Sequence, residues 1–209
     1  MKQGELKQLF FIAVFLPNHI QEQIAQQVEH ARNSNQTPDS WTWKRSSNYH
    51  ISLAFPGRLN TGELRKLKDA LSQVDIEAFD IKISGMNWFE RTQNKASTNT
   101  HVVWAQPTEH SANSLKALQS QIQDALKRRG FGYGRTEFLP HITIVKTPID
   151  DAGLAQDFMR SHDDLKTDSW RCDSFGIYKT LNEGDPEHPD NNDGEGSRFQ
   201  KVSEFRLRR

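Results

Sequence analysis

The chain has 209 residues, enough to bury a sizeable core as one large domain or as two small lobes. Its 27 basic and 27 acidic residues balance, which excludes the strongly basic surface by which some proteins coat nucleic acid. No apolar run approaches the ~20 residues needed to cross a bilayer, and no small-residue cleavage site follows the apolar stretch near the N-terminus. We therefore expect a cytoplasmic protein that does not bind membranes.

The first quarter of the chain predicts a strand followed by a helix. Residues 9–16 form a continuous apolar run closed by Pro17, a pattern typical of a central strand buried on both faces. Asn18 and Gln21 have the spacing of a helix N-cap signature. Apolar residues then recur at helical spacing on a polar segment, which predicts a surface helix ending near Arg32.

The next segment predicts two short strands and a second helix. Residues 41–45 and 49–55 are rich in β-forming residues, and the Pro56-Gly57 pair predicts a turn after them. Asn60 and Glu63 form a capping signature for a helix whose leucines share one face.

The middle of the chain predicts a hairpin and then the clearest helix. Residues 79–89 and 100–106 favour strands, and the polar segment between them favours a turn. Apolar residues at spacings of three and four follow, and basic residues fill the last turn before Gly130, as expected of a helix C-terminus.

The last third predicts two strands around a short helix, an acidic loop and a final strand. The strands are expected at residues 139–145 and 170–180, with a helix at 150–162 between them. Residues 182–197 contain many acidic residues, prolines and glycines, which predicts a mobile loop before a closing strand at 198–207. The order of elements predicts an α+β protein with mostly antiparallel sheets, folded as a single domain over residues 1–209.

Two short segments share one pattern. His50-Ile51-Ser52-Leu53 and His141-Ile142-Thr143-Ile144 each place a hydroxyl residue two positions after a histidine, with aliphatic residues between. Because side chains alternate along a strand, the histidine and the hydroxyl lie on one face while the aliphatic residues enter the core. One such segment alone is more often a structural histidine in a strand. Its recurrence in the other half of the chain favours two halves of one polar site.

The side chains in these segments suit acid/base chemistry on a phosphate. Histidine has an unperturbed pKa near neutrality, so one imidazole serves as a base and another as an acid at physiological pH. Hydroxyl groups donate hydrogen bonds to phosphate oxygens that gain negative charge in a transition state. The remaining histidines lack metal-ligand spacing, and the single cysteine, Cys172, excludes a cysteine cluster. We therefore predict no metal and no cofactor.

The paired tetrads resemble the signature of the 2H phosphoesterase superfamily, and within it the bacterial RNA 2′,3′-cyclic phosphodiesterases, or LigT-like 2′-5′ RNA ligases. The resemblance extends to the opening strand at 9–17, the first motif with its Phe-x-Gly sequence at 50–57, and the second motif at 138–146. It implies a bilobal fold in which two antiparallel sheets with outer helices surround a central cleft. Each lobe then supplies one motif to that cleft.

The resemblance also implies an activity. It implies hydrolysis of a terminal 2′,3′-cyclic phosphate on RNA to a 2′-phosphomonoester, and in some members a reversible 2′-5′ ligation. His50 and His141 are then the catalytic pair, and we favour His50 as the acid and His141 as the base. Ser52 and Thr143 are then phosphate-binding residues, with Ser52 standing where the family usually has threonine. The expected partners are RNA ends or nucleotides with a cyclic phosphate, and the expected state is a monomer.

Two further residues are candidates for substrate contacts. Lys146 stands where the family usually has a phosphate-binding arginine, and lysine keeps the charge without the bidentate fork. Strict alternation puts Lys146 on the face opposite His141, so it reaches the site only where the strand bends. Phe11 is a candidate for stacking on a base. Two alternatives stay open: a 2H enzyme for small cyclic nucleotides or 2′-5′ oligonucleotides, and a noncatalytic module that binds RNA ends.

Overall fold

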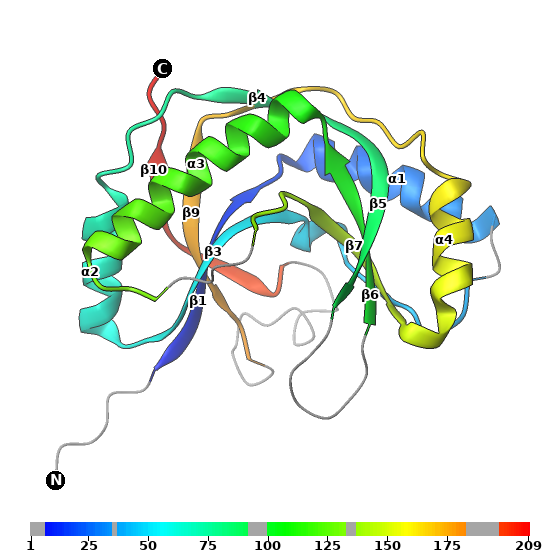
Figure 1. The fold of residues 1–209 in the computed structure, drawn as a ribbon, viewed down its shortest axis with the longest axis horizontal. Coiled ribbons are helices and arrows are strands. Elements are labelled where there is room, and N and C mark those ends of the chain that lie inside the picture. The colour runs from blue at the N-terminus through cyan, green and yellow to red at the C-terminus, as the bar shows by residue number, and fades with distance from the viewer. Residues whose placement is uncertain (1–6, 35–36, 92–99, 133–136, 183–196) are drawn as a thin grey trace, which may run out of the picture.

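The structure of the protein is a computed structural model that describes residues 7–34, 37–91, 100–132, 137–182 and 197–209 (Figure 1). Apart from its two end residues, the predicted acidic loop at 182–197 lies outside the described residues. None of the described helices is long and apolar enough to span a membrane.

The described residues form ten strands, four α-helices and two short 3₁₀ helices. The strands are β1 (Gln8–Phe15), β2 (Thr42–Trp43), β3 (His50–Leu59), β4 (Phe79–Ile81), β5 (Ile83–Arg91), β6 (Thr100–Pro107), β7 (Ile142–Pro148), β8 (Trp170–Cys172), β9 (Ser174–Thr180) and β10 (Phe199–Arg206). The helices are α1 (Asn18–Ser34), η1 (Ser46–Asn48), α2 (Thr61–Leu71), α3 (Glu109–Arg128), η2 (Ile149–Asp151) and α4 (Ala152–Arg160).

The strands form two four-stranded antiparallel sheets. Sheet 1 has the order β10-β9-β1-β3 and sheet 2 has the order β2-β7-β6-β5, while β4 and β8 form a separate pair. The apolar run at 9–16 is β1, which lies inside sheet 1 with its middle residues buried, as predicted. The predicted α+β class with two antiparallel sheets is confirmed.

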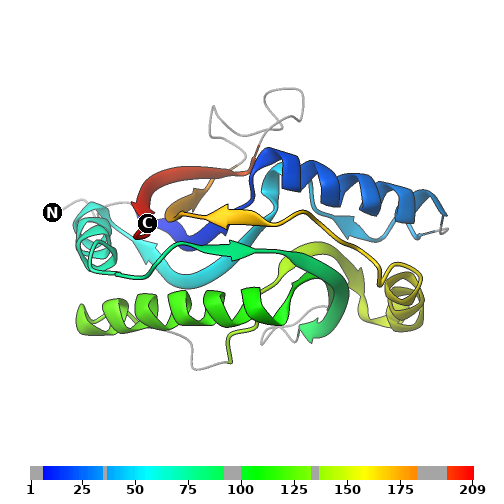
Figure 2. The same ribbon diagram turned by 90° about the horizontal axis from the view of Figure 1, so that it is seen from above.

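The helices cover the outer sides of the two sheets, and two of them cross between sheets. Viewed from above, α1 and α3 flank the strands on opposite sides, and α2 and α4 lie at opposite ends (Figure 2). Helix α1 follows β1 of sheet 1, yet Arg32 of α1 lies over the ring of Trp43, which belongs to sheet 2. Helix α3 follows β6 of sheet 2 and packs against α2 and β3. These crossings tie the two sheets into one body.

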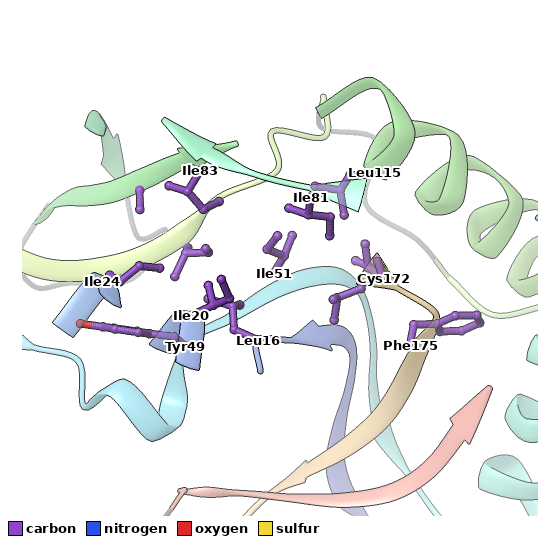
Figure 3. Packing of buried hydrophobic residues seen from close by; sticks show 14 of the residues in the cluster. Leu16, Ile20, Ile24, Tyr49, Ile51, Ile81, Ile83, Leu115, Cys172 and Phe175 are labelled. Carbon is purple, nitrogen blue, oxygen red and sulfur yellow. The ribbon is translucent and has the colours of Figure 1, made fainter. Parts of the chain in front are cut away.

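A single large cluster of buried side chains joins both halves of the molecule. Ile51 of β3 packs in it among side chains from several other elements, as the close-up in Figure 3 shows. The cluster also takes in Ile12 from sheet 1 and Ile142 from sheet 2. Cys172 is buried in the same cluster. The core therefore fixes the position of each sheet relative to the other.

Most predicted elements are confirmed, including the capping box of Asn60 and Glu63 at the start of α2. The predicted turn at Pro56-Gly57 is wrong, because β3 continues through these residues to Leu59. The pairing of β3 with β1 changes register around this irregular segment. Gly57 adopts a φ of 90°, which glycine tolerates.

Three other predictions needed correction. The predicted strand at 79–89 is divided at Lys82, because β4 pairs with β8 while β5 pairs with β6 in sheet 2. Asn18 does not precede the first helix but is its first residue, and the carbonyl of Pro17 accepts the first backbone hydrogen bonds. The predicted strand at 170–180 is divided at Asp173, because β8 pairs with β4 while β9 pairs with β1 in sheet 1. One predicted strand thus contributes to two sheets.

Candidate functional site

The first tetrad lies at the start of β3, and its polar side chains are on the face of sheet 1 turned away from the large core. His50 is paired with Phe15 and Ser52 with Ala13, whereas Ile51 is paired with Val14. Ile51 is fully buried, and His50 and Ser52 are partly buried on the opposite face. The alternation predicted from the sequence therefore holds for this segment. We call this face of each sheet, the one that carries the histidine, the site face.

The second tetrad follows the same plan in sheet 2. His141 lies just before β7, and Thr143 in β7 is paired with Trp104. Ile142 and Ile144 have no exposed surface, while His141 and Thr143 are partly buried. The ring of Trp104 contacts the ring of His141 at a centroid distance of 5.9 Å, which puts His141, Thr143 and Trp104 on one face.

Both imidazoles are held by the same local hydrogen bond. Nδ1 of His50 lies 2.7 Å from the carbonyl oxygen of Asn48, and Nδ1 of His141 lies 2.8 Å from the carbonyl oxygen of Leu139. A carbonyl oxygen can only accept, so Nδ1 carries the hydrogen in both rings. Nε2 is then the nitrogen through which each ring takes up or gives a proton.

The surroundings of His50, including the charge of His141, lower the pKa of its ring. Burial lowers the pKa of His50 to about 4, against the hydrogen bond to the Asn48 carbonyl, which raises it. The positive charges of His141 and Lys44 lower this pKa further. Strands β3 and β7 approach each other where the two sheets meet. The structure therefore brings the two tetrads together, one from each sheet.

Lys146 lies on the same face as Thr143, contrary to the strict alternation assumed from the sequence. Thr143 is paired with Trp104, and Lys146 is paired with Val102, two residues away from Trp104 on β6. A register shift between these pairs leaves Ile144 as the additional residue of a β-bulge in β7. The bulge buries two consecutive residues and returns the partly buried Lys146 to the site face.

A second lysine joins this region and was not predicted from the sequence. Thr42 of β2 is paired with Lys146, and the backbone N–H of Lys44 donates to the carbonyl of Ile144 at 2.8 Å. Lys44 is two residues from Thr42, so it lies on the site face as well. Its charge acts on His50. The sequence predicted a strand at 41–45, part of which is β2, but no pattern in the sequence predicts that this strand pairs with β7.

Aromatic rings surround His50. Its ring is stacked on Phe15 at 5.1 Å with an interplanar angle of 16°, and it contacts Phe11 and Phe199 at the same centroid distance. Phe11, the residue predicted to stack on a base, is only 4% exposed and packs between His50 and the outer ring of Phe55. Phe55 is 70% exposed. The stacking of Phe11 on a nucleobase stays a prediction. The ring of Phe55 is more accessible than that of Phe11.

Among the described residues, no group of three or more histidine, cysteine, aspartate or glutamate side chains is arranged to hold a metal ion. The described side chains of the site are instead imidazoles, hydroxyls and lysine ammonium groups. Such groups bind anions and exchange protons. The arrangement is suited to a phosphate ester.

An α+β fold of two antiparallel sheets, each carrying a histidine and a hydroxyl residue on its site face, defines the class of 2H phosphoesterases. A family model described as the 2′-5′ RNA ligase superfamily matches residues 20–184, and the chain belongs to this family. Its resemblance to the superfamily, first seen in the two tetrads, is thereby confirmed.

Curated relatives and solved structures agree with this assignment. The chain is 26% identical over 201 residues to an RNA 2′,3′-cyclic phosphodiesterase of Geobacillus stearothermophilus, a match covering 90% of this chain and 60% of the relative. It is 23% identical over 144 residues to one from Bacillus subtilis, covering 68% and 73%. The crystal structure of E. coli LigT in apo form has a TM-score of 0.66 at 18% identity and covers 98% of this chain and 99% of LigT, which shows a shared fold.

Proposed function

We propose that this protein is an RNA 2′,3′-cyclic phosphodiesterase that hydrolyses a terminal cyclic phosphate to a 2′-phosphomonoester. The observation that carries the proposal is the pair His50 and His141, which come from different sheets and interact through their charges. Each ring has its Nδ1 hydrogen fixed by a carbonyl, and each has a hydroxyl neighbour on its strand. The names of the relatives from Geobacillus stearothermophilus and Bacillus subtilis support the same activity.

The reaction needs one base and one acid. One imidazole takes a proton from water through Nε2 as the water oxygen attacks phosphorus, and the bond between phosphorus and the 3′ oxygen breaks. The other imidazole gives a proton to the departing 3′ oxygen, so the product keeps the phosphate on the 2′ oxygen. The hydroxyls of Ser52 and Thr143 donate hydrogen bonds to the nonbridging oxygens. Lys44 and Lys146 supply positive charge to the same anion.

The low pKa of His50 bears on which histidine is the base. With a pKa of about 4, its ring is neutral at pH 7 in the free protein, as a general base must be. His50 as base and His141 as acid therefore fits the free protein better than the opposite assignment favoured from the sequence. The opposite assignment requires a bound phosphate to raise the pKa of His50 by several units.

The test uses RNA that ends in a 2′,3′-cyclic phosphate, with EDTA present. We expect the wild type to release a 2′-phosphomonoester, and the His50→Ala and His141→Ala variants to lose about 10²- to 10⁴-fold in rate. Leu154→Ala is the matched control, because Leu154 is 52% exposed on α4 and belongs to neither tetrad. Full activity in either histidine variant would sink the proposal.

The same assay separates the alternatives. A 2H enzyme for small cyclic nucleotides would prefer a mononucleoside cyclic phosphate over RNA. A noncatalytic module would bind RNA ends and leave every substrate at the background rate. Reversible 2′-5′ ligation is tested by adding RNA with a free 5′ hydroxyl to the cyclic phosphate substrate and looking for a joined product.

A further inference from the structure

Asn48 is a buried polar residue that bonds to two separate parts of the candidate site. It is the last residue of the short helix η1, lies two residues before His50, and is only 7% exposed. Its backbone carbonyl accepts the hydrogen of Nδ1 of His50 at 2.7 Å. Its side chain instead bonds to the segment that leads into β10, 150 residues further along the chain. One residue therefore links the first tetrad to the last strand of sheet 1.

The side chain of Asn48 holds the backbone of this segment in place. Its Oδ1 accepts from the backbone N–H of Arg198 at 2.8 Å and from the hydroxyl of Ser197 at 3.1 Å. The same hydroxyl oxygen accepts from the backbone N–H of Phe199 at 3.1 Å. Because a backbone N–H can only donate, the amide of Asn48 must turn its oxygen toward the segment. Three hydrogen bonds thus connect residues 197–199 to Asn48.

The segment held by Asn48 carries a ring that covers His50. The ring of Phe199 meets the imidazole edge to face, with centroids 5.1 Å apart, and also contacts Phe11 at 4.9 Å. Strands β10 and β3 are the two edge strands of sheet 1, with β9 and β1 between them. Pairing within the sheet therefore does not bring β10 to His50. The bonds to Asn48 make this connection across the face of the sheet.

The contact with Phe199 changes the surroundings of the imidazole. Water stabilises the charged form of a histidine more than the neutral form, so an apolar ring that displaces water favours the neutral form. Burial is the largest cause of the low pKa of His50. A residue that holds Phe199 against His50 therefore contributes to the state in which His50 can accept a proton.

The titratable and charged groups around His50 come from both sheets. From the side of sheet 2, the charges of His141 and Lys44 lower its pKa. On sheet 1, burial raises the pKa of Tyr178 in β9 to about 12, so this phenol is neutral at pH 7. Arg198 at the start of β10 is exposed. The other charged side chains that β10 brings to this side are joined in ion pairs, and they are Lys201, Glu204 and Arg206.

We propose that Asn48 is a positioning residue for His50, with a backbone carbonyl that orients the imidazole and a side chain that holds Phe199 against it. Asn48 acts through His50, since its own polar atoms are occupied by the protein. The consequence for the reaction rests on the proposed function. The effect on the imidazole itself does not.

The experiment measures the pKa of His50 directly. NMR titration of the imidazole signals gives this pKa without substrate in wild type, Asn48→Ala and Phe199→Ala. From about 4 in wild type, we expect both variants to raise it by about 1 or more, because each lets water reach the ring. The double variant should raise it no further than the larger single effect, because both act through one contact. Ser111→Ala is the matched control and should leave the titration unchanged, since buried Ser111 also joins distant segments, accepting from the N–H of Lys82 at 2.9 Å.

The pH dependence of the rate separates this inference from the proposed function. If His50 is the base, the acidic limb of the kcat/KM profile on a 2′,3′-cyclic phosphate moves upward together with the pKa in Asn48→Ala. A pKa raised from about 4 to about 5 lowers the neutral fraction at pH 5 from about 0.9 to about 0.5, so kcat/KM falls about 2-fold more between pH 7.5 and pH 5 than in wild type. A raised pKa in a protein without turnover supports the positioning role while the proposed function fails.

An unchanged pKa of His50 in folded Asn48→Ala overturns the inference, whatever happens to the rate. Ser197→Ala is a milder second variant for the case in which Asn48→Ala does not fold. It removes the hydroxyl that joins Asn48 to the N–H of Phe199 but keeps the bond from Arg198. We expect a smaller rise of the same pKa there, and no rise would refute the role of Asn48 equally.

Discussion

The pKa of His50 gives the most quantitative prediction, because it links the site to the stability of the fold. Burial lowers this pKa from 6.5 to about 4 in the folded protein. Well above pH 6.5 the ring is neutral in both the folded and the unfolded state, so it adds no pH-dependent cost. Between about 6.5 and 4 the unfolded chain binds a proton that the folded protein does not bind, so the free energy of unfolding falls as the pH falls.

The size of this effect follows from the two pKa values. One pKa unit corresponds to about 1.4 kcal/mol, so the contribution of His50 is a loss of about 2 kcal/mol at pH 5 and about 3 kcal/mol once the pH is below 4. That loss is a large share of the ~5–15 kcal/mol by which domains are usually stable.

The assay is urea unfolding at pH 7 and pH 5 for wild type and His50→Asn. Asparagine keeps a donor for the carbonyl of Asn48 but does not titrate. We expect wild type to lose about 2 kcal/mol more than His50→Asn between the two pH values. His110→Asn, at an exposed histidine of α3, is the control and should lose as much as wild type. An equal loss in wild type and His50→Asn would refute the reasoning that His50 is held neutral by its surroundings.

Other predictions concern the second histidine, the phosphate contacts and the backbone. His141→Ala should recover most of its lost rate on a cyclic substrate with sulfur in place of the 3′ oxygen, since a thiolate leaves without a proton; no recovery would assign the acid role to the other histidine. Lys146→Arg should bind inorganic phosphate more tightly and Lys146→Met more weakly by calorimetry, because arginine offers a bidentate fork. Gly57→Ala should lower the free energy of unfolding by about 1–2 kcal/mol, as φ is 90° there. Asn48→Ala should cost about 1–3 kcal/mol and raise amide exchange at the start of β10, because its side chain caps that strand.

The sequence predicted those parts of the site that depend on local periodicity. The two tetrads alternate between site face and core as expected, because Ile51, Leu53, Ile142 and Ile144 are apolar enough to force their own burial. The same reasoning predicted β1 and the capped helix α2. In these places short-range pattern and tertiary packing favour the same structure.

What the sequence did not reveal depends on pairing between distant segments. The bulge at Ile144 lies in the pairing of β7 with β6, and one additional residue reverses the face on which all the following side chains of β7 lie. Lys146 reaches the site face for this reason. Lys44 reaches it because β2 pairs with β7, across about a hundred residues of chain. Neither relation has a local signature.

The two halves of the site share one plan but differ in surroundings, and that difference is what a two-proton reaction requires. Both rings are oriented by the same hydrogen bond to a carbonyl two residues earlier. His50, however, is enclosed by Phe11, Phe15 and Phe199, and burial lowers its pKa. A desolvated imidazole prefers to be neutral, and a positive charge on its partner reinforces that preference. Two histidines in identical surroundings would titrate together, whereas here burial keeps His50 neutral, which is the form in which a ring can accept a proton.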